Sequence, residues 1–545
     1  MSASSKKKLR NAEKAEQLTE RQLAEQKEAK KLKVFSIVMV AVVALMLAFA
    51  AYTAISGAIS GSGMAQRNTV AVTVGDHEIS AVEYNCFYVD AVSQFYNQVG
   101  TYASLYGLDV TKALDQQVID EEAGTTWADE FKTRAESSIK SVYGICDEAE
   151  ANGFTLTEDD QKFIDTQMAS LATNAVTYGY ANVNDYLAAM YSTGADKDNV
   201  RAYFEKCYTA QMYQQSIADA IEYTDADLQA KDAEDPDVFS SFSYNSYYMS
   251  TSKFLEGGTT DDEGNTTYSD EEKAAAVAAA EAAAKTLTAE NITSVEALDA
   301  AIAALSINAE AESAASTPYT NYSESYIASF IHDWVTDASR KAGDLTYIPS
   351  TTTAEDGTVT TNGYYVVYFI ERNDNEVPMQ NVRHILAAFE GGTTDTDGNV
   401  TYSDDEKAAA KAEAEAILAD WQNGEATEDS FAALANEKSD DGDGTTGGLY
   451  EDIYPGQMVT AFNDWCFDAS RKAGDTGIVE TEYGYHVMYY VSATDYTYRE
   501  YMIENTLLSE DVQAWHDALV ENVTVTAKNY DYVPTGMVIS PTTGY

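Results

Sequence analysis

Two histidines in the second half of the chain occupy positions where they could act together. His384 lies in NVRHILAAFEGG (381–392) and His486 in GYHVMYYV (484–491), and both segments have strand-forming composition. If the two strands are neighbours in one sheet, both imidazoles could face one pocket. The loop KSDDGDGTTGGL would supply Asp440 or Asp441 as an acidic companion. Such a group of polar side chains could favour a polar transition state electrostatically.

The histidines belong to the second copy of an internal repeat, residues 242–372 and 378–494. EGGTTDDEGNTTYSDEEKAAA recurs as EGGTTDTDGNVTYSDDEKAAA after 134 residues, and DASRKAGD occurs in both copies. Aligned on these segments, the first copy has Ser250 and Tyr365 where the second has His384 and His486. A single strand histidine is more often structural. A pair that is present in one copy and absent from the other indicates a joint role.

The elements around the histidines indicate a small α+β domain in each copy, because strand formers at both ends enclose Ala-rich helices. Before the repeats, residues 69–241 begin with a short alternating strand and a turn, and then show helical periodicity to about residue 222. We expect an all-helical domain there. Residues 495–545 predict one more amphipathic helix. The sequence thus favours an α+β multidomain protein.

An apolar segment near the N-terminus predicts a membrane anchor. Residues 34–56 contain no charged side chain and are long enough to span a bilayer as a helix. The Lys-rich flank predicts a cytoplasmic tail at residues 1–33 and export of the rest, with a Gly/Ser-containing linker at 57–68. The alternative is a cleaved signal peptide, for which Ala48-Phe49-Ala50 would be the processing site.

Charge and cysteine usage exclude two classes of function. Residues 1–33 carry ten of the 34 basic and five of the 89 acidic side chains, which leaves 24 and 84 for the rest. Nucleic acid is therefore not expected as a partner, because its phosphates would be repelled. The four cysteines are too few and too scattered for a disulfide framework or a metal site, and are expected to be small core residues: Cys86, Cys146, Cys207 and Cys466.

Residues 381–494 resemble the parvulin (PpiC, rotamase) type of peptidyl-prolyl cis-trans isomerase. The motifs are VRHILA, FAALANEKSDD, the GGL turn, PGQMVTAF and GDTGIVETEYGYHVMYY. The resemblance implies an antiparallel sheet wrapped by helices and a concave site for an Xaa-Pro bond, without metal or cofactor. It implies catalytic roles for His384, Asp441 and His486, and a substrate pocket of Leu449, Met458 and Phe462, with Tyr483 at a position where the family commonly has Ser or Thr. The first copy is predicted to be inactive.

The order of segments is similar to that of exported foldases of the PrsA and SurA type. In that family the closing helix packs back onto an N-terminal helical chaperone domain. The resemblance implies a single-pass, membrane-anchored, extracytoplasmic foldase whose partners are unfolded exported polypeptides with Xaa-Pro bonds. A homodimer is a further option for its assembly.

Two alternatives stay open. One is a non-catalytic holdase or surface-binding protein whose parvulin folds are vestigial. The other is a calcium-dependent adhesin, since DTDGNVTYSDDE has the ligand spacing of an EF-hand loop. However, the glycine of that loop falls at position 4, and Ser403 and Glu406 also form a capping-box pattern that recurs at Ser269 and Glu272.

Overall fold

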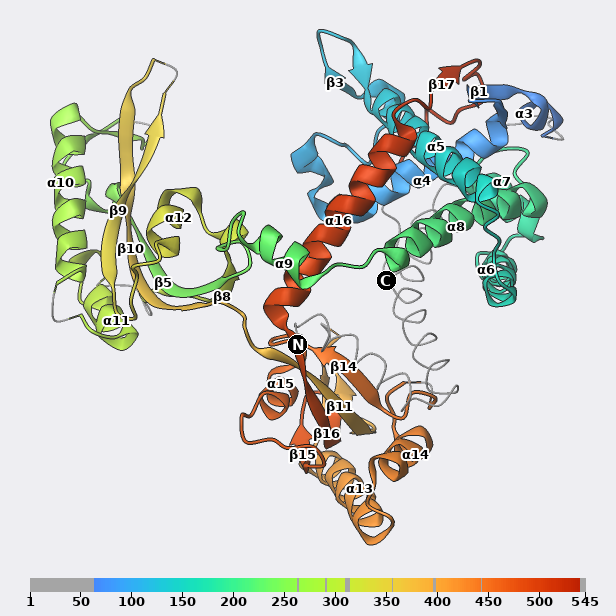
Figure 1. Ribbon diagram of the computed structural model, residues 1–545. Helices are drawn as coiled ribbons and strands as arrows, with labels where there is room; N and C mark the ends of the chain where they lie inside the picture. The colour runs from blue at the N-terminus through green and yellow to red at the C-terminus, as the bar shows by residue number, and fades with distance from the viewer. Residues whose placement is uncertain are drawn as a thin grey trace. The chain divides into compact units, whose positions relative to one another are not determined.

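The computed structural model describes residues 63–539, except for 262–263, 290–291, 309–313, 355, 396–397 and 443. The predicted tail 1–33, the apolar segment 34–56 and the first part of the linker lie outside these residues. Within the described residues, no helix combines the length and the apolarity that crossing a membrane requires. The structure divides into two compact units (Figure 1). One contains residues 223–506, and the other combines the preceding residues with those from 507 onward.

The unit that combines the residues before 223 with those from 507 onward is mainly helical, and we call it the helical unit. Capping boxes start α5 and α6, where Thr126 and Thr157 accept from the backbone of the third helical residue. Nearly every turn of α4 is buried, so this helix forms the centre of the core. The helices before residue 223 are α3 (Met64–Asn68), α4 (Ala81–Val99), η1 (Gly100–Tyr106), η2 (Leu114–Gln116), α5 (Trp127–Ala151), α6 (Glu158–Thr177), α7 (Val183–Met190) and α8 (Lys197–Ala220).

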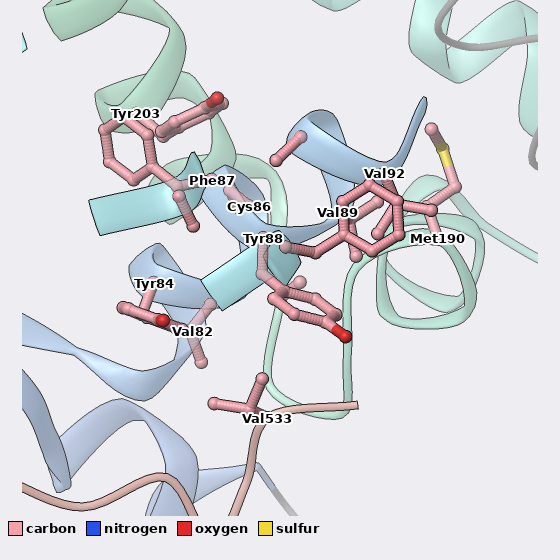
Figure 2. Packing of buried hydrophobic residues seen from close by; sticks show 14 of the residues in the cluster. Val82, Tyr84, Cys86, Phe87, Tyr88, Val89, Val92, Met190, Tyr203 and Val533 are labelled. Carbon is pink, nitrogen blue, oxygen red and sulfur yellow. The ribbon is translucent and has the colours of Figure 1, made fainter. Parts of the chain in front are cut away.

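The core of this unit joins residues that are distant in the sequence. Figure 2 shows Phe87 of α4 beside Tyr203 of α8, whose ring centroids are 4.8 Å apart with the rings nearly perpendicular. Val533, from the C-terminal segment, belongs to the same buried cluster. All four cysteines are free thiols, and Cys86 is fully buried in this core.

The prediction of an all-helical domain is wrong in one respect, because the unit also contains antiparallel sheet. Strand β1 (Val70–Val74) pairs with β2 (His77–Ser80) on one side and with β17 (Val525–Ala527) on the other. A second pair is formed by β3 (Val118–Asp120) and β4 (Thr125–Thr126). The helix α16 (Tyr498–Val520) leads to β17, and its residue Trp515 donates through Nε1 to Glu148 of α5 at 3.2 Å.

The other unit starts with α9 (Asp225–Asp232) and contains both copies of the repeat, here called the first module (242–372) and the second module (378–494). The first module comprises β5 (Ser241–Ser250), η3 (Thr251–Phe254), β6 (Thr259–Thr260), β7 (Thr266–Thr267), α10 (Asp270–Leu287), α11 (Val295–Ala303), η4 (Ser306–Asn308), β8 (Thr317–Ser323), η5 (Glu324–Tyr326), α12 (Ser329–Thr336), β9 (Leu345–Thr353) and β10 (Val359–Asn373).

The second module repeats this topology, which confirms the prediction of two α+β copies. The sheet orders are β8-β5-β10-β9 and β14-β11-β16-β15, both antiparallel. Capping boxes at Ser269 and Ser403 start the Ala-rich helices of both copies, as predicted. The elements of the second module are β11 (Pro378–Ala388), β12 (Thr393–Thr394), β13 (Val400–Thr401), α13 (Asp404–Asn423), α14 (Glu428–Lys438), β14 (Leu449–Ile453), α15 (Thr460–Cys466), β15 (Thr476–Glu480) and β16 (Gly484–Thr497).

The sheet of the second module buries a different set of side chains on each face, because successive strand residues point to opposite sides. One face packs against α13 and α14, and includes Ile385, Val487 and Tyr489. The other face carries Val382 and Met488, and packs against α15. His384 and His486 lie on this second face, since they alternate with Ile385 and Val487.

The register of the strands corrects the alignment of the two copies. Gly363 pairs with Ser250 in the first module, and the equivalent Gly484 pairs with Ala388 in the second. The counterpart of His384 is therefore Ser246, four residues before the predicted Ser250. The cause is the 3-10 turn η3, which follows β5 directly and adds residues before the shared Glu-Gly-Gly segment. Tyr365 stays the counterpart of His486.

An arginine-centred junction connects the chain segments that enter and leave the modules. Arg499, at the start of α16, is 6% exposed and donates to Asp232 Oδ1 through Nη2 and Nε at 2.6 and 3.0 Å. Its guanidinium also donates to Ser240 Oγ and to the carbonyl oxygen of Asp374. Arg372 donates to the same Ser240 hydroxyl. One network of charged hydrogen bonds thus connects three separate segments of the chain: residues 232–240, residues 372–374 and the start of α16.

Candidate active site

The two histidines predicted to act together are in contact. Their strands, β11 and β16, are the central neighbours of the sheet, and Leu386 pairs with His486 while His384 pairs with Met488. The Nδ1 atoms of His384 and His486 are 3.1 Å apart. The two residues are only 2% and 6% exposed. The sequence prediction that both imidazoles face one place is therefore confirmed by the geometry.

The acidic companion is Asp441, and the loop that carries it is fastened along β11. Asp441 Oδ2 lies 3.1 Å from His384 Nε2. The side chain of the neighbouring Asp440 instead accepts a hydrogen bond from the backbone amide of Ala388 at 2.9 Å. At the end of the loop, His384 N donates to the carbonyl oxygen of Gly448 at 2.9 Å. A Cβ on Gly448 would lie 2.1 Å from the His384 carbonyl oxygen, so only glycine permits this approach.

Electrostatics set the charge states of this group. Hydrogen bonding to His384 is the main reason that the pKa of Asp441 is lowered to about 2. Burial is the main reason that the pKa of His486 is lowered to about 4; the neighbouring His384 acts in the same direction, and Asp441 opposes it. At neutral pH Asp441 is therefore ionised and His486 is neutral.

The ionised carboxylate orients one end of a chain of hydrogen bonds. An ionised carboxylate only accepts, so Asp441 accepts from His384 Nε2 and from the Tyr450 hydroxyl, which lies at 2.6 Å. With Asp441 as an acceptor, every ring nitrogen has a partner when His384 Nδ1 accepts from His486 Nδ1. His486 Nε2 then accepts from the Thr481 hydroxyl at 2.9 Å. Each ring is thereby held in a single tautomer, because its two nitrogens have different partners.

Apolar side chains border the histidines on the same face of the sheet. Phe462 of α15 is fully buried, and its ring lies edge-on to both imidazoles at centroid distances of 5.4 Å from His384 and 5.3 Å from His486. Met458 is half-buried and packs against the same cluster. Leu449, the third predicted pocket residue, is half-buried at the start of β14 and pairs with Arg383, so the register places it on the opposite face of the sheet from the histidines. The site thus combines an apolar wall with a polar chain of fixed direction.

Two residues of the site were not found by reading the sequence. The expected hydroxyl position was Tyr483, yet that side chain is 58% exposed, and the hydroxyl beside His486 belongs to Thr481 at the end of β15. Thr481 Oγ1 also accepts from the amide of Tyr483 at 3.2 Å, which orients it toward the ring. The second is Tyr450, whose ring packs 4.6 Å from that of His384. The sequence could have indicated Tyr450 by its position directly after Leu449, which was predicted to line the pocket.

Thr481 offers a test of the proton assignment. Thr481→Val removes the donor to His486 Nε2 and leaves the shape of the side chain nearly unchanged. We expect about a fivefold loss in kcat/KM for the isomerisation that the parvulin resemblance implies, since one aligned hydrogen bond contributes about 1 kcal/mol. Thr481→Ser should restore most of the rate. A Val variant with the parent rate would show that the chain of hydrogen bonds does not support catalysis.

The lowered pKa of His486 predicts a specific pH dependence. Activity should fall as the pH passes through about 4, because protonated Nε2 of His486 cannot accept from Thr481. Folding stability should fall in the same direction. The unfolded ring binds a proton near its ordinary pKa of 6.5, so the free energy of unfolding decreases by about 3 kcal/mol between pH 6.5 and 4. Urea unfolding across this range measures the slope, and His486→Gln should lack this part of it.

The first module has no such group. Ser246 and Tyr365 replace the two histidines, and Ile331 of α12 stands where the second module has Phe462. In the part of the chain that the structure describes, no group of three or more His, Cys, Asp or Glu side chains is arranged to hold a metal ion. In the loop with EF-hand spacing, Asp395 accepts from the amide of Asn399 at 2.9 Å.

Comparison with known proteins identifies the domain that carries this site. A family model described as the PPIC-type PPIase domain, or rotamase, matches residues 384–492. Among solved structures, the chain is similar to the PPIase domain of TbPar42, with 24% identity, 21% of this chain and 99% of that chain covered, and a TM-score of 0.17. PrsA from Bacillus anthracis shows 20% identity, with 27% and 59% covered and a TM-score of 0.17. PrsA from Bacillus subtilis shows 14% identity, with 77% and 98% covered and a TM-score of 0.28.

At these identities and TM-scores, the similar structures do not by themselves establish a shared activity. A search of curated proteins found no match. The family match covers both histidines, Asp441 and the apolar wall, which are the residues that the structure brings together. Residues 384–492 therefore form a peptidyl-prolyl cis-trans isomerase domain of the PPIC, or parvulin, type.

Proposed function

We propose that the second module isomerises Xaa-Pro bonds at the site of His384, His486 and Asp441. The observation that carries this proposal is the directed hydrogen-bond chain from Thr481 to Asp441 beside the buried ring of Phe462. An Xaa-Pro amide exchanges only in tens to hundreds of seconds without a catalyst. Its barrier, about 18 to 20 kcal/mol for an amide, comes from the partial double bond.

The parts of the site match what this reaction needs. Apolar side chains such as Phe462 and Met458 can grip the pyrrolidine ring while the amide twists. The polar chain can then favour the twisted amide, whose charge distribution differs from that of the planar one. Only interactions that are stronger in the twisted state accelerate the reaction. Donors and acceptors whose directions are already fixed cost no reorganisation at that moment.

For the whole protein we propose a membrane-anchored foldase that acts outside the cytoplasm on unfolded exported polypeptides. The apolar residues 34–56 and their Lys-rich flank support the anchor. Alkaline extraction of cell membranes tests it, since an anchored chain should stay in the pellet. Protease added to intact cells with permeable walls should remove the modules. Release of the chain by alkali would exclude a spanning anchor.

The test of the catalytic proposal is protease-coupled isomerisation of Ala-Xaa-Pro-Phe peptides by the full-length chain in detergent micelles. We expect saturable acceleration for several Xaa residues. If a well-folded chain gives none, the holdase alternative gains support, and suppression of aggregation of an unfolded protein becomes the relevant measurement. Exposed apolar residues of the helical unit, such as Tyr102, Leu105 and Tyr106 in η1, favour this second candidate.

A further inference from the structure

The first module carries exposed aromatic rings on the face that corresponds to the active-site face of the second. Three of them are unusually exposed for large apolar side chains: Tyr326 at 76%, Phe330 at 41% and Tyr248 at 39%. α12 lies over this face of the sheet and α10 over the opposite one (Figure 1). The three exposed rings and three half-buried tyrosines form what we call the aromatic surface: Tyr248, Tyr319, Tyr322, Tyr326, Phe330 and Tyr365.

The rings of the aromatic surface support one another. Tyr365 contacts Phe330 and Tyr248 at centroid distances of 4.2 and 4.6 Å. Tyr322 contacts Tyr319 at 5.0 Å and Tyr326 at 6.2 Å. Tyr319, Tyr322 and Tyr365 also pack on one buried cluster, which includes Val367 and Ile331. The surface is therefore held in place before anything binds, and preorganisation lowers the entropic cost of binding.

Three positions of the aromatic surface have counterparts in the second module that the strand register identifies. By the strand register, Tyr365 corresponds to His486 and Tyr248 to Leu386. Tyr319 pairs with Tyr244 as Tyr450 pairs with Val382, so these tyrosines also correspond. The inference drawn from these correspondences rests on the proposed function of the second module. On the equivalent face, the first module lacks both histidines and has added the ring of Tyr248 in place of a leucine, which suits contact with a polypeptide without chemistry.

The charge of the first module indicates what such a polypeptide carries. Residues 242–372 contain 20 acidic and six basic side chains. At the aromatic surface itself, Asp333 of α12 is fully exposed and Glu324 lies two residues before Tyr326; both acids contact the ring of His332, at 3.1 and 2.7 Å. The neighbouring Arg340 is already paired with Asp337 and Asp344, at 3.3 and 3.5 Å. A basic ligand is therefore complementary to this face.

We propose that the aromatic surface binds, without isomerising it, an extended proline-containing segment of an unfolded polypeptide that has Lys or Arg beside its prolines. Proline-rich segments adopt the polyproline II helix, which has no internal hydrogen bonds. Grooves lined by aromatic rings recognise this helix through its pyrrolidine rings. The tyrosine hydroxyls can donate to its free carbonyl groups. The first module thereby holds a client segment while the second module acts on another Xaa-Pro bond.

The test is isothermal titration calorimetry of the full-length chain with the dodecapeptide (Lys-Pro-Ala-Pro)3. We expect two binding sites in the parent chain and one in the double variant Tyr326→Ser/Phe330→Ser, both of which replace exposed side chains. Val359→Ser, an exposed apolar position in the β10 strand, is the matched control and should keep both sites. Replacing Lys by Glu, or Pro by Ala, should weaken binding to the aromatic surface at least tenfold.

The outcomes separate this inference from the proposed function. Isomerisation of the tetrapeptide should stay within twofold of the parent in the double variant. If the second module has no working site, the parent should bind one peptide and the double variant none, and the inference stands. Equal stoichiometry in parent and double variant would overturn it. A dimeric parent that becomes monomeric in the double variant and binds no peptide at this surface would also overturn it, since the face would then join two copies of the chain.

Discussion

A chain with both His384→Ala and His486→Ala should lose at least about 100-fold in kcat/KM for Xaa-Pro isomerisation. Removing one preorganised polar group from such a site typically costs 10²- to 10³-fold. The double variant removes both rings that connect Thr481 to Asp441. Protease-coupled kinetics measures the loss. Because the two rings are buried, circular dichroism and urea unfolding must show that the variant is folded.

A second variant keeps the prediction testable if the double variant does not fold. Asp441 lies on a loop with 40% of its side chain exposed, so Asp441→Asn should leave the fold intact. It should lower kcat/KM at least about tenfold, because a neutral amide can donate to His384 and reverse the tautomers of both rings. Asp440→Asn is the matched control, since its remaining oxygen can still accept from Ala388. A folded Asp441→Asn chain with the parent rate would contradict the proposed role of the carboxylate.

Arg499→Ala should destabilise the unit formed by residues 223–506 by about 3 to 5 kcal/mol. Removing the buried guanidinium leaves the carboxylate of Asp232, which is 34% exposed, without its partner and leaves several acceptors unpaired. Here the guanidinium serves Asp232, Ser240 and the carbonyl oxygens of Asp374 and Pro236. Urea unfolding of the full-length chain, followed by hydrogen exchange, measures the change and locates it.

The conservative control distinguishes charge from geometry. Arg499→Lys keeps the positive charge but loses the planar set of donors that reaches four partners, so we expect it to recover less than half of the lost stability. Hydrogen exchange should accelerate in residues 232–240 and 372–377, where the partners lie. If Arg499→Ala changes the midpoint of unfolding by less than 0.5 M urea, roughly 1 kcal/mol at a typical slope, the junction does not stabilise this unit.

The sequence predicted the centre of the site because two signals pointed to it independently. The repeat showed that His384 and His486 vary together, and the composition of their segments indicated strands. The parvulin motifs then selected Asp441 from two adjacent acids. The structure explains that selection, since Asp440 is occupied by the backbone of β11 and Asp441 reaches the ring.

The remaining errors come from contacts that depend on backbone geometry. Tyr483 was expected at the hydroxyl position, but the turn before β16 brings Thr481 to His486 and leaves Tyr483 exposed. The first copy was aligned on its conserved Glu-Gly-Gly segment, which conceals the residues of η3. In the helical unit, β17 has only three residues, which is too short to show the alternating pattern of a strand in the sequence. They form a strand only because β1 offers an edge.

The pairing of β1 with β17 also determines when the protein can finish folding during synthesis. Val72 pairs with Ala527, so the edge of β1 has no β17 partner until synthesis has passed residue 527. Both modules have local contacts and can fold earlier, while the helical unit waits for its last strand and for Val533 of its core. An uncovered strand edge is prone to wrong pairings. A ribosome that stops early, or a protease that trims the C-terminus, would therefore release a chain with competent modules but an incomplete helical unit.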